Sequence, residues 1–511
     1  MQTGFPLQPM FVAILLMTFG QIAVAQETLW ETYRESGLAQ YQAGNYVEAE
    51  RLLRSALQTA EAYNPSGGHV AKTLNDLGLL YETQGKYTEA EALFNRSLVM
   101  LQGLRGVDDS ETATVLSNLA TFYSRFGKLD QATTVLNRAL TDVESQLGAW
   151  HPTTAVVLNN LAGVYQELNK YDQAEALYKR ALAIDESVYG PQHPEVAGVL
   201  SNLGYLYTEV GRFEEADALY KRALSIRETS SGIEHPETMK VINNIGYLEY
   251  QKGNYDKAES LYKKTLVVWE RVLGPMHMDV GNCRKNLGDL YRDTGRYDLS
   301  EQEYKLVLAN WEKALGTNHT WIAALLLDMS NLYFQQKKYD LIEPLLTRAI
   351  GIVEKLLGPE RAEMAPLLKA MADLRRAQGK NDEASSFYKR AITIREKILA
   401  MNPEDRKALN DLAWLQATCP DDQLRDAKKA FDNANKAYQI EGGKRCSSFN
   451  TLAAAYAENR AYQQAQEWAT KAIERSKSES SKKLIRERLK LYERQQPFRD
   501  EGFQLQAQNV F

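Results

Sequence analysis

The histidines of this chain are the residues best suited to bind a metal ion, and their spacing argues against that role. Five of the six recur every 42 residues, at His151, His193, His235, His277 and His319, and His69 lies two residues out of register. Zinc ligands lie ~2 Å from their ion, whereas histidines one repeat apart are separated by the thickness of a helix pair. Pro152, Pro194 and Pro236 follow three of them directly, which predicts helix starts. We therefore expect no metal site.

The three cysteines also indicate no chemistry. Cys283 falls within a predicted helix, and Cys419 and Cys446 lie near opposite ends of two neighbouring helices that should run parallel. At 1.5 Å per residue their separation is roughly 15 to 20 Å, beyond the ~7 Å Cα limit for a disulfide. We expect free, partly buried thiols. The chain also has no phosphate-binding glycine loop, nucleophile elbow or zinc-protease motif, so we predict neither an enzyme nor a cofactor.

The elements that position these residues repeat along the chain. In residues 151–190 the apolar side chains follow a helical period on both sides of a central turn. That turn slot recurs almost every 42 residues, at Gly44, Gly85, Gly127, Asn169, Gly211, Gly253, Gly295, Lys337 and Gly379. A second series lies 21 residues out of phase, at Gly106, Gly148, Gly190, Gly232, Gly274, Gly316 and Gly358. Two breaks in each unit predict a helical hairpin.

Small residues occupy one slot in each helix of the hairpin. In the second helix the slot holds Ala49, Ala90, Ala132, Ala174, Ala216, Ala258, Ser300, Ile342 and Ala384. In the first helix it holds Gly78, Ala120, Ala162, Gly204, Gly246, Gly288, Ser330 and Ala372. Glycine inside a helix costs about 1 kcal/mol relative to alanine, and we expect close helix contact to compensate. Tyrosines fill the bulky slots beside these positions.

The resulting pattern, N-L-A/G-x-x-Y-x-x-x-G-x-Y-x-x-A, resembles the tetratricopeptide repeat, whose usual period is about 34 residues. The longer period and the H-P-x-x-A opening are similar to the kinesin-light-chain type. The resemblance implies an all-α, right-handed solenoid of about eleven hairpins with a C-terminal capping helix. It further implies that the first helices line a concave groove that binds a peptide or a partner protein, without catalysis.

The sequence predicts three segments after residue 25. Residues 26–400 read as nine hairpins of about 42 residues, and 401–476 as two more. Residues 477–511 read as a capping helix, which a solenoid needs over its last apolar face, and a disordered tail from Gln495. This ending resembles a C-terminal module of exported bacterial repeat proteins, in which a charged helix and a short P-F/Y-R tail close the array.

Residues 1–25 read as a signal peptide. Residues 10–20 form an apolar run too short to span a bilayer comfortably, and Ala23 and Ala25 give a small-x-small cleavage pattern. We expect an exported protein, periplasmic or extracellular, and the alternative is an uncleaved N-terminal membrane anchor. No later segment is apolar enough to span a membrane, and a net charge of -5 argues against nucleic acid as a partner.

One polar series is not fully explained by packing. One position before the slot of Leu161, the successive repeats carry Asp76, Asn118, Asn160, Asn202, Asn244, Asn286 and Asp328. Asparagine is some 0.5 kcal/mol below alanine as a helix former. The resemblance places this position on the groove, where an amide can pair with a peptide backbone. Alternatively, the amides bond between neighbouring helices and hold the superhelix together. The predicted groove residues are Asn118, Asn160, Asn202, Asn244, Asn286, Tyr205, Tyr247 and Arg292.

These patterns predict a non-enzymatic scaffold for a protein or peptide partner, with self-association possible. The alternative is an architectural rod or self-assembling spacer without a specific groove ligand. Some members of the family hold a terminal carboxylate through Lys and Asn side chains. Here Lys240, Asn244 and Asn286 match the start of that pattern, but Ala324 and Asp328 depart from it, and the aspartate would repel a carboxylate.

The cleavage pattern gives the first prediction. Because Ala23 and Ala25 frame the cleavage site, the mature protein should begin at Gln26. N-terminal sequencing of the protein recovered from the exporting compartment checks this. A chain that retains Met1 would instead support the uncleaved anchor.

Overall fold

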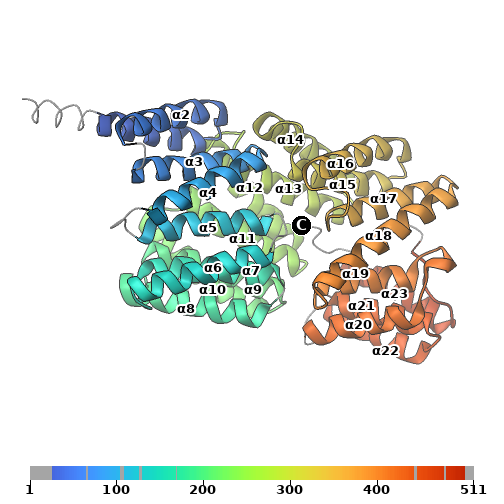
Figure 1. Cartoon of the computed structure of the whole chain (residues 1–511). Helices are drawn as coiled ribbons and strands as arrows, with labels where there is room; N and C mark the ends of the chain where they lie inside the picture. Colours follow the sequence, from blue (N-terminus) through green and yellow to red (C-terminus); the bar gives the residue numbers. More distant parts are fainter. Residues whose placement is uncertain are drawn as a thin grey trace, which may run out of the picture. The chain divides into compact units, whose positions relative to one another are not determined.

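The computed structural model describes a chain built of helices. It covers residues 26–64, 67–103, 109–125, 129–168, 170–441, 446–476 and 479–500, and these contain no strand. Consecutive helices pack side by side in antiparallel pairs (Figure 1). The all-α repeat fold predicted from the sequence is thus confirmed. Within the described residues, no helix is both long and apolar enough to cross a membrane.

The chain divides into two compact units, residues 1–160 and 161–511, and the boundary falls inside α7 (Pro152–Glu167). The first unit begins with a helix over residues 26–42. Its further helices are α2 (Tyr46–Tyr63), α3 (Gly68–Thr83), α4 (Tyr87–Gly103), α5 (Asp109–Arg125) and α6 (Leu129–Gln146).

The second unit holds the other helices. Its first part comprises α8 (Tyr171–Tyr189), α9 (Pro194–Glu209), α10 (Phe213–Ser231), α11 (Pro236–Gln251), α12 (Tyr255–Val272), α13 (Met278–Asp293), α14 (Tyr297–Leu315), α15 (Thr320–Gln335), η1 (Tyr339–Leu341) and α16 (Ile342–Leu356). Its second part comprises α17 (Met364–Ala377), α18 (Asn381–Met401), α19 (Arg406–Thr418), η2 (Asp422–Leu424), α20 (Ala427–Glu441), α21 (Cys446–Glu458), α22 (Tyr462–Arg475) and α23 (Glu479–Glu493).

The turns lie where the two glycine series predict them. Gly211 (φ 78°) and Gly190 (φ 87°) represent the two series, and both have the left-handed backbone that favours glycine. Lys337 occupies a glycine slot and takes the same conformation with φ 58°. Gly106, Gly127 and Asn169 lie outside the described residues. The histidines also act as predicted: the Nδ1 atom of His193 accepts a hydrogen bond from the backbone N–H of Glu195, which caps α9.

The small slots bring the two helices of a hairpin into close contact. A Cβ atom added to Gly246 of α11 would lie 2.7 Å from the Tyr262 ring of α12. Gly204 has the same relation to Tyr220. The ring therefore packs directly on the backbone of the first helix, which compensates for the low helix propensity of glycine. Ala174 and Ala216 in the second-helix slot are fully buried.

Ionic networks join each hairpin to the next. Glu175 of α8 accepts hydrogen bonds from the Tyr207 hydroxyl of α9 at 2.7 Å and from Arg212 at 2.6 Å, and it pairs with Lys179 at 2.7 Å. Burial alone would raise the pKa of Glu175, but the hydrogen bonds from Lys179, Tyr207 and Arg212 lower it to about 2. The same arrangement recurs 84 residues later around Glu259, Tyr291 and Arg296.

The C-terminal end departs from the prediction. The last described helix, α23, is followed by residues 494–500, which fold back onto the helices of the second unit. Phe498 and Asp500 are buried, and the Trp414 indole donates to the Asp500 carboxylate at 2.8 Å. The expectation of a disordered tail from Gln495 is therefore wrong for residues 495–500, because an aromatic ring and a paired carboxylate hold the segment. Residues 501–511 lie outside the described residues.

The packed face yields a stability prediction. Ala174→Phe should lower the free energy of unfolding by ~1 to 3 kcal/mol, because the slot has no room for a ring. Ala216→Phe should behave alike. Gln173→Phe is the matched control, since residue 173 is exposed on the same helix and should change stability little. Thermal unfolding followed by circular dichroism checks this. A neutral result at both alanines would show that the packed face is misassigned.

The Glu175 network predicts a dependence on pH. Its folded pKa of about 2 lies below the ordinary value of 4.5, so its contribution to stability is complete above pH 4.5 and is lost as the pH falls through about 2. The melting temperature of Glu175→Gln should therefore fall less than that of the native chain across this range. The exposed Glu214→Gln is the control. Equal slopes for all three proteins would contradict the assignment.

Candidate functional site

The first candidate surface is the face of the first helices that carries the asparagine series. In the first unit, Asn118 on α5 donates its side-chain amide to the Asn75 side chain of α3 at 2.9 Å. Asp76 of α3 pairs at 2.6 Å with Arg34 of the helix over residues 26–42, which is the preceding first helix. Asn160 on α7 is half-buried. Here the series links neighbouring first helices, as the bracing interpretation predicts.

The second unit carries the rest of the series. Asn286 of α13 donates to Asn243 of α11 at the long distance of 3.5 Å. Asn244 of α11 is half-buried, and Asn202 of α9 is exposed. The shorter amide bond of the series lies in the first unit, and Asn202 on α9 is the most exposed of the five asparagines.

Aromatic side chains lie next to these amides. The rings of Tyr205 (α9) and Tyr247 (α11) stack with centroids 5.6 Å apart, and Tyr250 continues the row at 6.4 Å from Tyr247. The Tyr247 hydroxyl donates to Glu209 at 2.8 Å. Tyr205 keeps 39% of its surface exposed, although it belongs to this ordered row. The two predicted groove tyrosines are thus brought together on one surface of α9 and α11.

A charge cluster follows on α13 and α15. Arg292 contacts Asp289 at 3.3 Å, Asp293 at 3.0 Å and Asp328 at 3.6 Å. Lys285 contacts Asp289 at 3.0 Å and Asp328 at 2.9 Å. The carboxylates therefore already neutralise both cations.

The Tyr304 hydroxyl of α14 donates to Asp289 at 2.6 Å and joins this cluster to the second helix. Burial alone would raise the pKa of Asp289, but Lys285 and Arg292 hold it below its ordinary value. Lys285 was not among the residues predicted from the sequence. The sequence does carry a signal for it. Lys285 and Asp289 stand four residues apart, on one face of a helix, and Asp328 lies on the next first helix.

The profile of the tetratricopeptide repeat family matches residues 30–103, 69–145, 111–187, 153–229, 237–313, 286–352 and 321–397. The chain belongs to the tetratricopeptide repeat family. This membership supports a general role as a protein-interaction scaffold, and the repeat is typically non-catalytic. No enzyme family is indicated. No match is found among curated proteins.

Solved structures of several other proteins resemble this chain. BtubC (BKLC) from P. vanneervenii is 24% identical and covers 50% of this chain and 92% of its own, with a TM-score of 0.36. A kinesin-light-chain repeat protein of Podosopora anserina is 20% identical and covers 40% and 98%, with a TM-score of 0.33. A Rap protein complexed with Competence and Sporulation Factor is 16% identical and covers 73% and 99%, with a TM-score of 0.47. These likenesses concern the fold alone.

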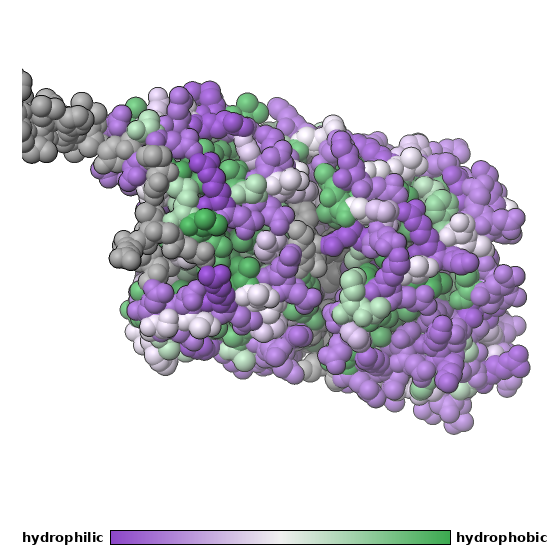
Figure 2. Space-filling model, viewed as in Figure 1, coloured by the Kyte–Doolittle hydropathy of each residue, from purple (hydrophilic) through white to green (hydrophobic). Residues whose placement is uncertain are grey.

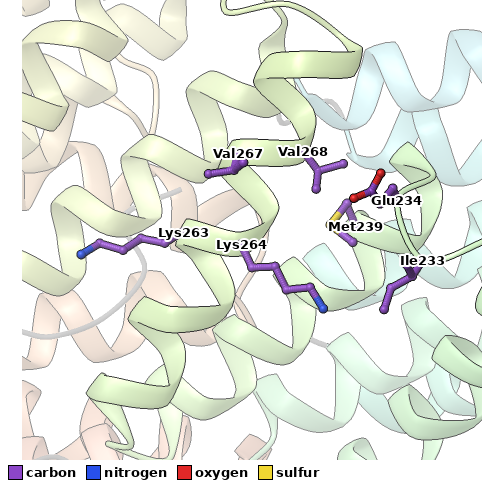
Figure 3. A pocket seen from close by; sticks show the side chains of 7 residues that line it. All are labelled: Ile233, Glu234, Met239, Lys263, Lys264, Val267 and Val268. Atoms are coloured by element: carbon purple, nitrogen blue, oxygen red, sulfur yellow. The ribbon is translucent and has the colours of Figure 1, made fainter.

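Outside this face, the described part of the chain also has a hollow. It measures about 430 Å³ and lies between α12 and the start of α11, and its lining includes Ile233, Met239 and Val267 (Figure 3). None of the predicted groove residues lines it. Among the described residues, no group of acidic, histidine or cysteine side chains is arranged to hold a metal.

The described cysteines are buried rather than presented on the candidate surface. Cys283 and Cys419 are free thiols, as predicted, but both are fully rather than partly buried. Burial raises the pKa of Cys419 to about 11. A thiol with a raised pKa is a poor nucleophile because little thiolate is present at neutral pH. The side chain of Cys446 lies outside the described residues.

Proposed function

We propose that the face of α9, α11 and α13 binds an extended segment of a partner protein. The observation that carries the proposal is the stacked pair Tyr205 and Tyr247, part of which stays exposed beside the asparagine side chains of the same helices. Tyrosine offers a large apolar surface with a polar tip, which suits a binding surface.

The chemistry of this face defines the kind of segment that it suits. The carboxamides of Asn202 and Asn244 can donate to and accept from successive peptide groups. The cations Lys285 and Arg292 are already paired with Asp289 and Asp328, so a terminal carboxylate gains no free charge there. Glu209 and Asp293, at the ends of α9 and α13, are likewise engaged, by the Tyr247 hydroxyl and by Arg292. The face therefore suits a segment without a strong charge of its own.

The alternative function is an architectural rod in which these amides only brace neighbouring helices. The 2.9 Å bond between Asn118 and Asn75 favours that interpretation for the first unit. On the face drawn in Figure 2, hydrophilic residues predominate and hydrophobic ones appear in short patches. A broad exposed apolar patch is the usual mark of an association surface, and the described residues of this face carry none.

We also propose that the protein acts outside the cytoplasm, in the periplasm or the extracellular space. Residues 1–25, on which this rests, lie outside the described residues. The partner is then expected in the same compartment. Immobilised mature chain, exposed to an extract of that compartment, provides the partner for the titration below after identification by mass spectrometry.

The triple variant Asn202→Ala, Asn244→Ala, Asn286→Ala separates binding from bracing. It removes several hydrogen bonds to a ligand backbone, each worth ~0.5 to 1.5 kcal/mol, so the affinity for the partner should fall about ten-fold or more. The melting temperature should stay nearly constant, because alanine is the better helix former. Binding titrations and melting curves check both expectations.

The control is Asn118→Ala, which removes the shorter amide bond of the first unit. It should lower the melting temperature and leave partner affinity unchanged. Full affinity in the triple variant, together with a destabilised chain, would contradict the groove assignment and leave the rod as the better account.

A further inference from the structure

Residues 498–500, which follow the last described helix, make a specific set of contacts with three first helices. The Asp500 carboxylate accepts from the Trp414 indole of α19 at 2.8 Å and lies 3.3 Å from the Lys369 ammonium of α17. The backbone N–H of Asp500 donates to the carbonyl of Thr418 at 2.9 Å. The carboxylate is thus recognised by a cation and an indole, and the main chain by a carbonyl at the end of α19.

The two preceding residues add an aromatic and a basic contact. Arg499 donates to Glu458 at the end of α21 at 2.6 Å. The Phe498 ring is buried, 5.9 Å from the Trp414 ring, and the Arg488 guanidinium of α23 lies 4.7 Å from its centroid. Each of the residues 498–500 therefore has its own recognition element.

The repeat register shows which face the segment occupies. Lys369, Asp373 and Tyr388 stand 84 residues, two repeats, after Lys285, Asp289 and Tyr304. Each set makes the same contacts, a lysine to an aspartate and a tyrosine hydroxyl to that aspartate. In the first set Lys285 binds a second carboxylate, from Asp328 of the next first helix.

In the second set the additional carboxylate comes from Asp500 of the tail. Trp414 follows Leu412 and Ala413 as Tyr205 follows Leu203 and Gly204. The tail thus lies on the same face of its helices as the asparagine and tyrosine side chains of α9 and α11.

We propose that residues 497–500 are an intramolecular ligand of a peptide-binding site formed by α17, α19 and α21, and that this site binds a partner segment of the same aromatic–basic–acidic chemistry when the tail leaves. The site uses none of the residues proposed for α9, α11 and α13, so the two proposals stand or fall separately. A tethered segment has an effective concentration on the order of mM. A free peptide therefore competes poorly until the tail is removed.

The test uses a fluorescein-labelled peptide with the sequence of residues 493–500 and an amidated end. Fluorescence polarisation measures its binding to the full chain, to a chain that ends at Arg494, and to the full-length variant Phe498→Ala, Asp500→Asn. The peptide should bind the shortened chain and the variant at least about ten-fold more tightly than it binds the full chain, because the tail no longer competes. Peptides carrying either substitution should bind weakly.

Two controls separate ligand recognition from folding. Melting curves establish that each protein unfolds cooperatively, and the full-length variant serves if the shortened chain does not fold. Trp414→Phe, introduced into that variant, keeps a ring but deletes the indole N–H that Asp500 accepts from, so it should weaken peptide binding. The proposal is overturned if the peptide binds no better when the tail is absent or altered, or if Trp414→Phe leaves its affinity unchanged.

Discussion

The two helices of a hairpin are held close together by the contact between a tyrosine ring and a small residue of the preceding helix. At Gly246 and Gly288 there is no space for even a methyl group beside Tyr262 and Tyr304. This contact fixes how near the two helices of a hairpin lie. It also delivers the Tyr304 hydroxyl to Asp289, so the contact that packs the hairpin also orders a charged group on the candidate binding face.

The charged groups of the candidate binding faces are balanced rather than free. Asp289 and Asp328 neutralise Lys285 and Arg292 on α13 and α15, and Lys369 is shared by Asp373 and Asp500. A buried charge that lost its partner would be costly. A ligand for this face must therefore bring its own compensation, through amide groups, aromatic rings or a carboxylate that replaces an existing one. The tail offers a ring, a cation and a carboxylate.

Much of the fold was predictable because its determinants are local and repeat. The turn glycines, the histidine caps such as His193 and the small slot at Ala174 each depend on residues within one hairpin. The candidate site was only partly predictable. The Tyr205 and Tyr247 stack follows from their shared slot one repeat apart. Lys285 and Asp328 occupy different slots of the repeat, so the 42-residue register alone does not pair them.

The docking of the tail was the least predictable feature. Asp500 and Trp414 are 86 residues apart, and no periodicity links them. We predicted a disordered tail from Gln495, but a carboxylate, a ring, a guanidinium and a main-chain bond hold residues 498–500 on the helices. An irregular segment binds to a surface that exists only once the helices have packed together. The sequence of the segment therefore does not predict where it docks.

The tyrosine and the small residue set the hairpin spacing as a pair, and a double-mutant cycle on Gly246→Ala and Tyr262→Leu measures their coupling. In the native background the added methyl group meets the ring, so Gly246→Ala should be destabilising despite a helix-propensity gain of about 1 kcal/mol. With Tyr262→Leu the steric conflict is relieved, and the same change should be neutral or stabilising. An identical effect of Gly246→Ala in both backgrounds would contradict the account.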